Sequence, residues 1–315
     1  MGKLVALIFI LLAVLGALAF SIGWLIDEVQ VKDPIELTSN IENYEPVQVI
    51  DYGATPVFSE KLRFNHNKLS FFIDPSCSQK RETSMREAFQ IFEDTMGIIS
   101  FYGMGDDSAD IVVECSDTYI ELGENLFAAG EGGPTNITNT SNFKTIQKGM
   151  IFLYEDQRCD RPVVEIHELG HVLGFDHTSD PTNIMYNISR CDQKISQDMI
   201  DLINELYSIK PLPDARISEL TAVKRGKYLD FNITVLNEGL LEIGDISLTL
   251  LSNDKIIDTI SLDGIGIGFG RTLRATNLEM FSSKIDTIDF IIDYEDEVEE
   301  LDEDNNLVQM TVGTA

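Results

Sequence analysis

The middle of the chain, residues 61–210, mixes two hydrophobic periods. Short apolar runs and strict alternation of apolar and polar residues both predict β-strands. Such runs occupy residues 68–73, 98–102, 109–115 and 149–154. In the segments between them, apolar residues recur at a longer period. This part of the chain is therefore predicted to contain both strands and helices.

A period near 3.6 residues predicts the helices of the same region. Within residues 81–96, one helical face collects the apolar side chains Met85, Ala88, Phe89 and Phe92. A later helix is expected from Ser196, which can cap its N-terminus, to Tyr207. Pro211 and Pro213 then break the pattern. We therefore place a domain boundary at this point.

The last part of the chain, residues 211–315, has the short alternating period of strands. Turn residues at 237–239 and 253–254 separate these runs. Their spacing predicts an all-β, immunoglobulin-like sandwich of about 100 residues. Strands are expected at residues 228–236, 246–251, 256–260, 271–277, 287–292 and 307–312.

The start of the chain carries a targeting segment. Residues 4–26 are uncharged and long enough to cross a bilayer as a helix. Lys3 precedes them, so the positive-inside rule places the chain after this segment on the outer side of the membrane. An Ala-Leu-Ala sequence at residues 17–19 has the form that signal peptidase cleaves. Residues 1–27 are therefore a transmembrane anchor, which we favour, or a signal peptide, and either one exports the protein. Residues 28–60 are polar and contain proline, which predicts a linker or stalk.

Composition and charge narrow the range of partners. The chain has 53 acidic and 23 basic side chains, a formal net charge of -30. Nucleic acids and anionic membrane surfaces would repel such a protein. We therefore expect no nucleic-acid partner, and membrane contact through the N-terminal segment alone. A solvated acidic surface explains the charge in general, and Ca²⁺ bound by some of the carboxylates is the alternative.

One segment, VVEIHELGHVLGFDH, contains three of the four histidines of the chain. His167 and His171 are four residues apart, so a helix places them on the same face. Gly174 can adopt the left-handed conformation that ends a helix, which lets the chain return His177 to the same point. Three imidazoles with one position open to water are typical of a catalytic zinc site. We expect one Zn²⁺ per chain, with Glu168 beside it.

The expected chemistry of such a site is hydrolysis. Zinc lowers the pKa of a bound water from about 15.7 towards about 7 and polarises a carbonyl group. Glu168 would accept the proton of the water and deliver it to the leaving group. The alternative is a core helix with three buried histidines, each of which would then need a hydrogen-bond partner.

The full motif H-E-x-x-H-x-x-G-x-x-H resembles that of the metzincin metallopeptidases. Thr178, Asp180-Pro181 and Met185-Tyr186 follow it, which is most similar to the matrixins. The resemblance covers about residues 61–208 and includes the strand ADIVVEC. It implies an α+β zincin domain with a mixed sheet and an active-site helix. It also implies that Met185 lies in a tight turn beneath the zinc.

Four cysteines, Cys77, Cys115, Cys159 and Cys191, fit an oxidising compartment and allow three disulfide pairings. In the matrixin fold the first and third strands are parallel neighbours. The resemblance therefore implies a Cys77–Cys115 bond, and Cys159 would then pair with Cys191. No cysteine precedes Cys77, so latency through a propeptide cysteine is not expected.

The resemblance raises two further questions about the catalytic domain. Matrixins hold a second, structural zinc, but His66 is the one histidine outside the motif, so we expect that zinc to be missing. Ca²⁺ held by Asp106, Asp107 and Asp110 could replace it, although an exposed acidic turn explains these residues better. Residues 126–133 are either an edge strand along which a peptide substrate binds by β-addition or a plain surface loop.

The C-terminal region resembles the CARDB-type adhesion domains of exported proteins in two segments, VLNEGLLEIGDISLTLLSNDK and ELDEDNN. An acidic run at residues 293–304 is either a Ca²⁺ site or a solvated hairpin, which we favour. Two functions stay open. The favoured one is an exported zinc endopeptidase that the sandwich positions on a surface partner. The alternative is a cell-surface adhesion protein in which the sandwich carries the function and the zincin domain is weakly active.

Overall fold

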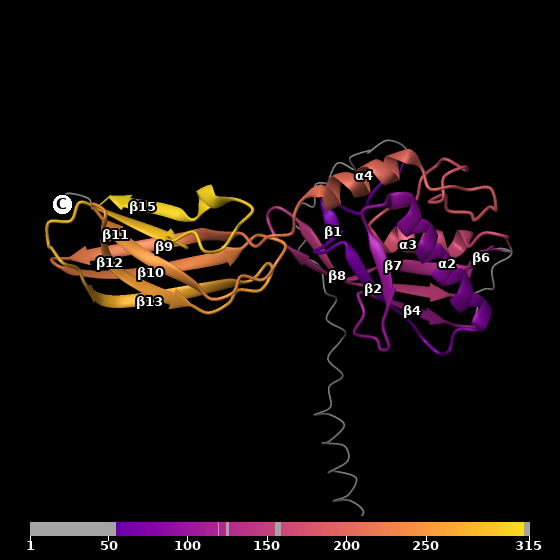
Figure 1. The fold of residues 1–315 in the computed structure, drawn as a ribbon, viewed down its shortest axis with the longest axis horizontal. Coiled ribbons are helices and arrows are strands. Elements are labelled where there is room, and N and C mark those ends of the chain that lie inside the picture. The colour runs from indigo at the N-terminus through magenta and orange to yellow at the C-terminus, as the bar shows by residue number, and fades with distance from the viewer. Residues whose placement is uncertain (1–54, 119, 124–125, 155–158, 312–315) are drawn as a thin grey trace, which may run out of the picture. The chain divides into compact units, whose positions relative to one another are not determined.

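A computed structural model of the protein describes residues 55–118, 120–123, 126–154 and 159–311 (Figure 1). These residues form a mixed α/β domain and an all-β sandwich. The predicted anchor or signal peptide and most of the predicted linker lie outside the described residues. Within the described part of the chain, no helix has both the length and the apolar character needed to cross a membrane.

The first domain is built on a six-stranded sheet with the order β1-β8-β4-β2-β3, in which β7 also pairs with β8. All pairings are parallel except that of β7 with β8, which is antiparallel. The sheet is therefore mixed, as the resemblance implied. Its strands are β1 (Leu62–Phe64), β2 (Lys68–Ile73), β3 (Ser100–Gly103), β4 (Ile111–Cys115), β7 (Gly130–Asn139) and β8 (Lys144–Leu153). A separate hairpin joins β5 (Ile120–Gly123) and β6 (Leu126–Ala128).

Three helices belong to this domain: α2 (Gln79–Met96), α3 (Val163–Val172) and α4 (Gln197–Ser208). Ser78 caps α2, since its side chain accepts a hydrogen bond from the Arg81 N–H, and Gly97 ends the helix with a φ of 71°. The apolar faces of all three helices share one core with the sheet. Its members include Phe92, Ile151, Leu169 and Ile203.

The start of α4 differs from the prediction in one detail. Ser196 is the N-cap residue, but its side chain makes no capping hydrogen bond. Its hydroxyl instead pairs with Thr55 Oγ1 at 3.2 Å and accepts from Asn183 Nδ2 at 3.0 Å. The prediction of a side-chain cap was wrong because these tertiary partners compete for the same oxygen.

Two disulfides link the four cysteines of the first domain. Cys77 pairs with Cys115, and Cys159 pairs with Cys191. This is the pairing that the family resemblance implied. The first bond joins the segment after β2 to the end of β4. The second joins the approach to α3 to the segment after Met185.

The second domain is a sandwich of two antiparallel sheets, with strand orders β13-β10-β9 and β12-β11-β14-β15. Alternate residues of β10 are buried, as the two-residue period predicted. Between the sheets, Phe231 and Phe290 meet edge to face with ring centroids 5.3 Å apart. The elements are β9 (Ala215–Arg225), β10 (Tyr228–Asn237), β11 (Ile246–Ser252), β12 (Lys255–Leu262), β13 (Gly270–Glu279), β14 (Thr287–Ile292), η1 (Glu303–Asn305) and β15 (Leu307–Thr311).

Candidate metal centre

Helix α3 and the turn after it bring three histidines together. His167 and His171 lie one turn apart on the helix, with ring centroids 4.6 Å apart. Gly174 then adopts a φ of 103°, a conformation that favours glycine. The Phe175 N–H donates to Gly170 O at 3.1 Å, which closes the end of the helix. The chain turns there and returns His177 to the two helical histidines.

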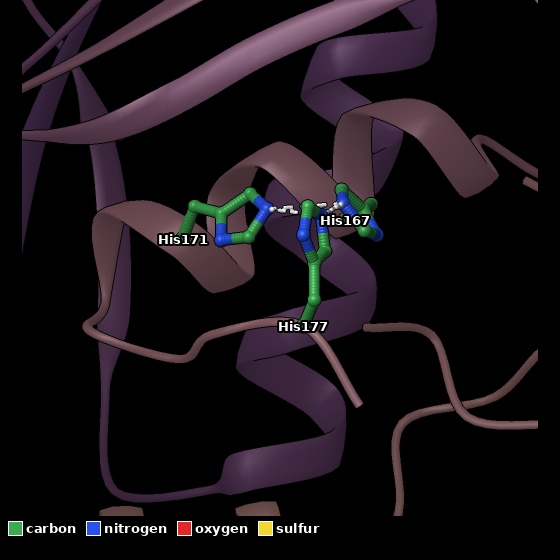
Figure 2. Close-up of side chains that lie close together, drawn as sticks. All are labelled: His167, His171 and His177. Carbon is green, nitrogen blue, oxygen red and sulfur yellow. Dashed lines mark hydrogen bonds between the residues drawn. The ribbon is translucent and has the colours of Figure 1, made fainter. Parts of the chain in front are cut away.

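The three rings converge on one point through the same atom (Figure 2). The Nε2 atom of His167 lies 3.0 Å from that of His171, and Nε2 of His177 lies 3.2 Å from each of them. Nitrogens that bind one zinc ion tetrahedrally at about 2.0 Å are about 3.3 Å apart. No other group of three His, Cys, Asp or Glu in the described part of the chain brings its ligand atoms within 4.8 Å of one another.

The other ring nitrogen shows which tautomer is present. Nδ1 of His167 lies 2.7 Å from the Ile184 carbonyl oxygen, and Nδ1 of His171 lies 2.8 Å from the Phe175 carbonyl oxygen. A carbonyl oxygen can only accept, so both Nδ1 atoms carry protons and both Nε2 atoms present lone pairs. Lone pairs that face one another repel unless a cation lies between them. The donor set therefore fits a zinc ion.

Burial keeps these imidazoles neutral, as metal ligands must be. Burial and, to a smaller extent, the neighbouring His171 lower the pKa of His167 to about 3. The pKa of His171 is also lowered, mainly by burial. His177 differs because its side chain is exposed. The group is thus open to solvent on the side of His177.

Met185 packs against the helix that carries His167 and His171. It is fully buried, and a Cβ atom added to Gly170 would fall 3.2 Å from its Cε atom, so it packs against α3 between the two helical histidines. The Thr178 N–H donates to Met185 O at 3.0 Å, and Asn183 Oδ1 accepts from the Met185 N–H at 2.9 Å. These bonds join the turn of Met185 to the segment that carries His177.

Glu168 is buried beside the histidines, with 6% of its surface exposed. Burial raises the pKa of its carboxyl group to about 8, and the nearby charges of Glu131 and Glu165 act in the same direction. Desolvation disfavours the ionised carboxylate. The ionised carboxylate of Glu168 is therefore a stronger base than that of an exposed glutamate, but in the metal-free protein the group is mostly protonated at neutral pH.

Two residues near Glu168 could not be recognised from the sequence. The hydroxyl of Tyr154 donates to Glu131 Oε2 at 3.0 Å, and burial together with Glu131 and Glu168 raises the pKa of Tyr154 to about 12. Glu131 belongs to β7 and Tyr154 directly follows β8, so both precede α3 in the chain. Their proximity to the motif depends on the pairing of β7 with β8, which sequence spacing does not encode.

Edge strand β7 crosses α3 at very short range. A Cβ atom on Gly130 would fall 2.8 Å from the Cγ atom of Glu168, and one on Gly132 would fall 2.9 Å from the Cα atom of Glu168. Both positions therefore need glycine. Residues 130–133, for which the sequence left a strand and a loop equally open, are part of the strand.

Two of the three aspartates proposed for calcium, Asp106 and Asp110, serve other contacts. Asp110 Oδ2 accepts from the Ser70 N–H at 2.7 Å and lies 3.1 Å from His66 Nε2. Asp106 Oδ1 accepts from the Ser108 N–H at 3.0 Å. Serine hydrogen bonds lower the pKa of Asp106. These contacts agree with the alternative of a surface turn.

Comparison with known proteins identifies both domains. The matrixin family model matches residues 63–208, and the CARDB family model matches residues 212–310. The chain carries a matrixin domain followed by a CARDB domain. Stromelysin-2 from Rattus norvegicus is 24% identical over 221 residues, which are 63% of this chain and 45% of that protein. The chain thus spans less than half the length of this relative.

The CARDB domain is similar to solved structures. One is a CARDB domain from Pyrococcus furiosus in complex with di-metal ions, with 20% identity over 32% of this chain and 87% of the other, and a TM-score of 0.26. Another is a domain from Methanosarcina acetivorans, with 20% identity over 33% of this chain and 93% of the other, and a TM-score of 0.29.

The match places the first domain in a family of metallopeptidases. The three histidines of this domain have the geometry of a zinc site. The two disulfides and the family together indicate an extracytoplasmic location.

Proposed function

We propose that the protein is an exported zinc-dependent metalloendopeptidase. The observation that carries this proposal is the convergence of three Nε2 atoms within 3.2 Å of one another. His167, His171 and His177 are the proposed ligands of one Zn²⁺ per chain. Three protein ligands leave one coordination position for water or substrate, as in catalytic zinc sites.

Each residue of the site has a distinct role. When bound, zinc supplies a Lewis acid that makes water a nucleophile at neutral pH and polarises the scissile carbonyl. Glu168 is the general base that takes the proton of the water and then passes it to the leaving amine nitrogen. The carbonyl oxygens of Ile184 and Phe175 orient the rings of His167 and His171. Met185 supports the helix from below.

Edge strand β7 is the proposed platform for the substrate. It pairs with β8 along one side, and no strand of the described chain pairs with its other side. An extended peptide can therefore add to this free edge through main-chain hydrogen bonds. Because Gly130 and Gly132 lie against Glu168, a peptide bound here would run past the proposed base.

The same proposal covers the organisation of the whole chain. Residues 61–210 are the catalytic domain and residues 211–315 are the CARDB domain, which positions the enzyme on a surface partner. Residues 1–27 anchor the protein in the membrane or direct its secretion, and residues 28–60 act as a stalk. The disulfides support export, since they form in oxidising compartments.

Metal content and peptide hydrolysis test the proposal. The full chain should contain one zinc ion, and His167→Ala, His171→Ala or His177→Ala should each lose it. His66→Ala is the matched control and should keep it, because His66 pairs with Asp110 away from the site. Equal zinc in all of these proteins would refute the proposed ligands.

Turnover on a mixed peptide library separates the enzyme from its alternative. A chelator and Glu168→Ala should each abolish hydrolysis, while Glu168→Ala should retain zinc. Hydrolysis that survives Glu168→Ala would rule out the proposed base. A zinc-loaded parent that cleaves nothing would favour the alternative, a cell-surface adhesion protein whose CARDB domain carries the function.

A further inference from the structure

In the CARDB domain, the connection from β14 to β15 folds back onto the start of β9. The Leu301 N–H donates to the Pro213 carbonyl oxygen at 3.0 Å. Next to it, the Ala215 N–H donates to Glu300 Oε2 at 3.1 Å. These two bonds bring the carboxyl groups of Glu300 and Asp214 into one buried region.

Four side chains make up this region, which we call the oxygen cluster: Asp214, Glu300, Asn305 and Asn306. Asp214 is fully buried, and Glu300 and Asn306 expose only 6% and 5% of their surfaces. Asn305 Nδ2 donates to Asp214 Oδ1 at 2.8 Å. The cluster thus joins residues that are about ninety positions apart in the chain.

Three oxygens of the cluster lack a hydrogen-bond donor. They are Glu300 Oε1, Asn305 Oδ1 and Asn306 Oδ1, and all three are buried. A buried acceptor without a donor is unfavourable, and native structures rarely leave one. Three such oxygens beside two carboxyl groups indicate a missing positively charged partner.

The surrounding charges increase this demand. The side chains whose charges act on Glu300 are Glu303 and Asp214, and those that act on Asp214 are Asp302 and Glu238. All of them are acidic. Glu238 is paired with Arg216 at 3.1 Å. Buried carboxylates without such a partner are unfavourable unless a cation or a proton compensates their charge.

We propose that the oxygen cluster is a Ca²⁺ site that closes the β14–β15 connection onto β9. The available donors are two carboxylates and two amide carbonyls, with no nitrogen or sulfur among them. Oxygen donors of this kind select a hard cation. Calcium accepts irregular geometry and carbonyl ligands, whereas magnesium requires near-ideal octahedral geometry and keeps several waters.

The bound ion would stabilise the CARDB domain at one end. It would link Asp214, which directly precedes β9, to Glu300 and to the residues around η1. The competing occupant is a proton on Glu300, which would allow the carboxyl group to donate to Asn306 Oδ1. Both occupants remove the same unfavourable charge, so the experiment must distinguish them.

Calcium content of the full, zinc-loaded chain is the first measurement. After equilibration with calcium at neutral pH and removal of free ions, the parent should hold one calcium ion per chain more than Glu300→Gln or Asp214→Asn. Glu297→Gln is the matched control, because Glu297 is an exposed acid of the same connection. It should bind as much calcium as the parent.

Thermal unfolding of the same proteins is the second measurement. Calcium should raise the melting temperature of the CARDB domain in the parent and in Glu297→Gln, but not in the two cluster variants. In calcium-free buffer Glu300→Gln should melt no lower than the parent, since it removes a buried charge, and this result also shows that it folds. Equal calcium in the parent and both cluster variants, or a parent stabilised by acid alone, would overturn the proposal.

Discussion

The crossing of β7 over α3 allows one substitution to be worked out in detail. A Cβ atom on Gly132 would fall 2.9 Å from both the Cα and the carbonyl carbon of Glu168, and closer still to its carbonyl oxygen. These are backbone atoms of the helix, so no side-chain rotation relieves the contact. The strand cannot move freely either, because Gly132 is paired with Ile151 of β8. Gly132→Ala must therefore push the strand away from the helix.

The size of the effect follows from these distances. Carbon atoms pack favourably at about 3.5–4.0 Å, so the backbones must separate by about 0.6 Å or more. Overpacking of this kind costs about 1–3 kcal/mol of unfolding free energy. For a domain of this size we expect the melting temperature to fall by about 2–4 °C per kcal/mol. Displacement of the strand from Glu168 should also lower kcat/KM by about 10- to 100-fold.

Gly133→Ala is the control for this experiment. Gly133 is the next residue of the same strand, and a Cβ atom there meets nothing within 4 Å. Its unfolding free energy should change by no more than about 0.5 kcal/mol. Calorimetry of the full chain and peptide hydrolysis give the two readouts. Equal melting temperatures for the two variants would refute the packing argument, whereas reduced stability with unchanged hydrolysis would refute only the functional one.

Three further predictions concern other parts of the chain. Met185→Ala should cost about 2–5 kcal/mol by opening a cavity under the histidines, and Met185→Leu less than about 1.5 kcal/mol. Denaturant unfolding measures both values, and an equal loss of stability in Met185→Ala and Met185→Leu would contradict the cavity argument. Cys159→Ser should cost about 3–4 kcal/mol and speed hydrogen exchange near the active site. If hydrogen exchange becomes faster by the same factor in both domains, the Cys159–Cys191 disulfide does not act locally on the active-site region. Without calcium, folding raises the pKa of Glu300 from 4.5 to about 7. The protonated Glu300 carboxyl group therefore contributes fully to the free energy of unfolding below pH 4.5, and this contribution is lost as pH rises through 7. We expect the free energy of unfolding to fall by about 2–3 kcal/mol over this pH range. If Glu300→Gln shows the same dependence of unfolding free energy on pH as the parent, Glu300 is not its cause.

Much of the secondary structure could be predicted because burial follows a local period. The predicted strand at residues 68–73 is β2, and the positive φ values of Asn253 and Asp254 match the predicted turn. Strand β9 (Ala215–Arg225) was missed because charged residues interrupt its alternation. Strand β1 is only three residues long and contains the buried Arg63, so no period can be recognised in it. The buried guanidinium of Arg63 is stabilised because it donates to the Leu206 carbonyl oxygen of helix α4.

The sequence by itself determined the group of three histidines. A helix places residues four apart on one face, and Gly174 permits the turn that returns His177, so the whole arrangement is local. Only the tertiary structure decided what surrounds it. The glycines of β7, the pair Tyr154 and Glu131, and the oxygen cluster all join segments that are distant along the chain. Spacing along one segment says nothing about such contacts, because they depend on which strands pair and how closely helices pack.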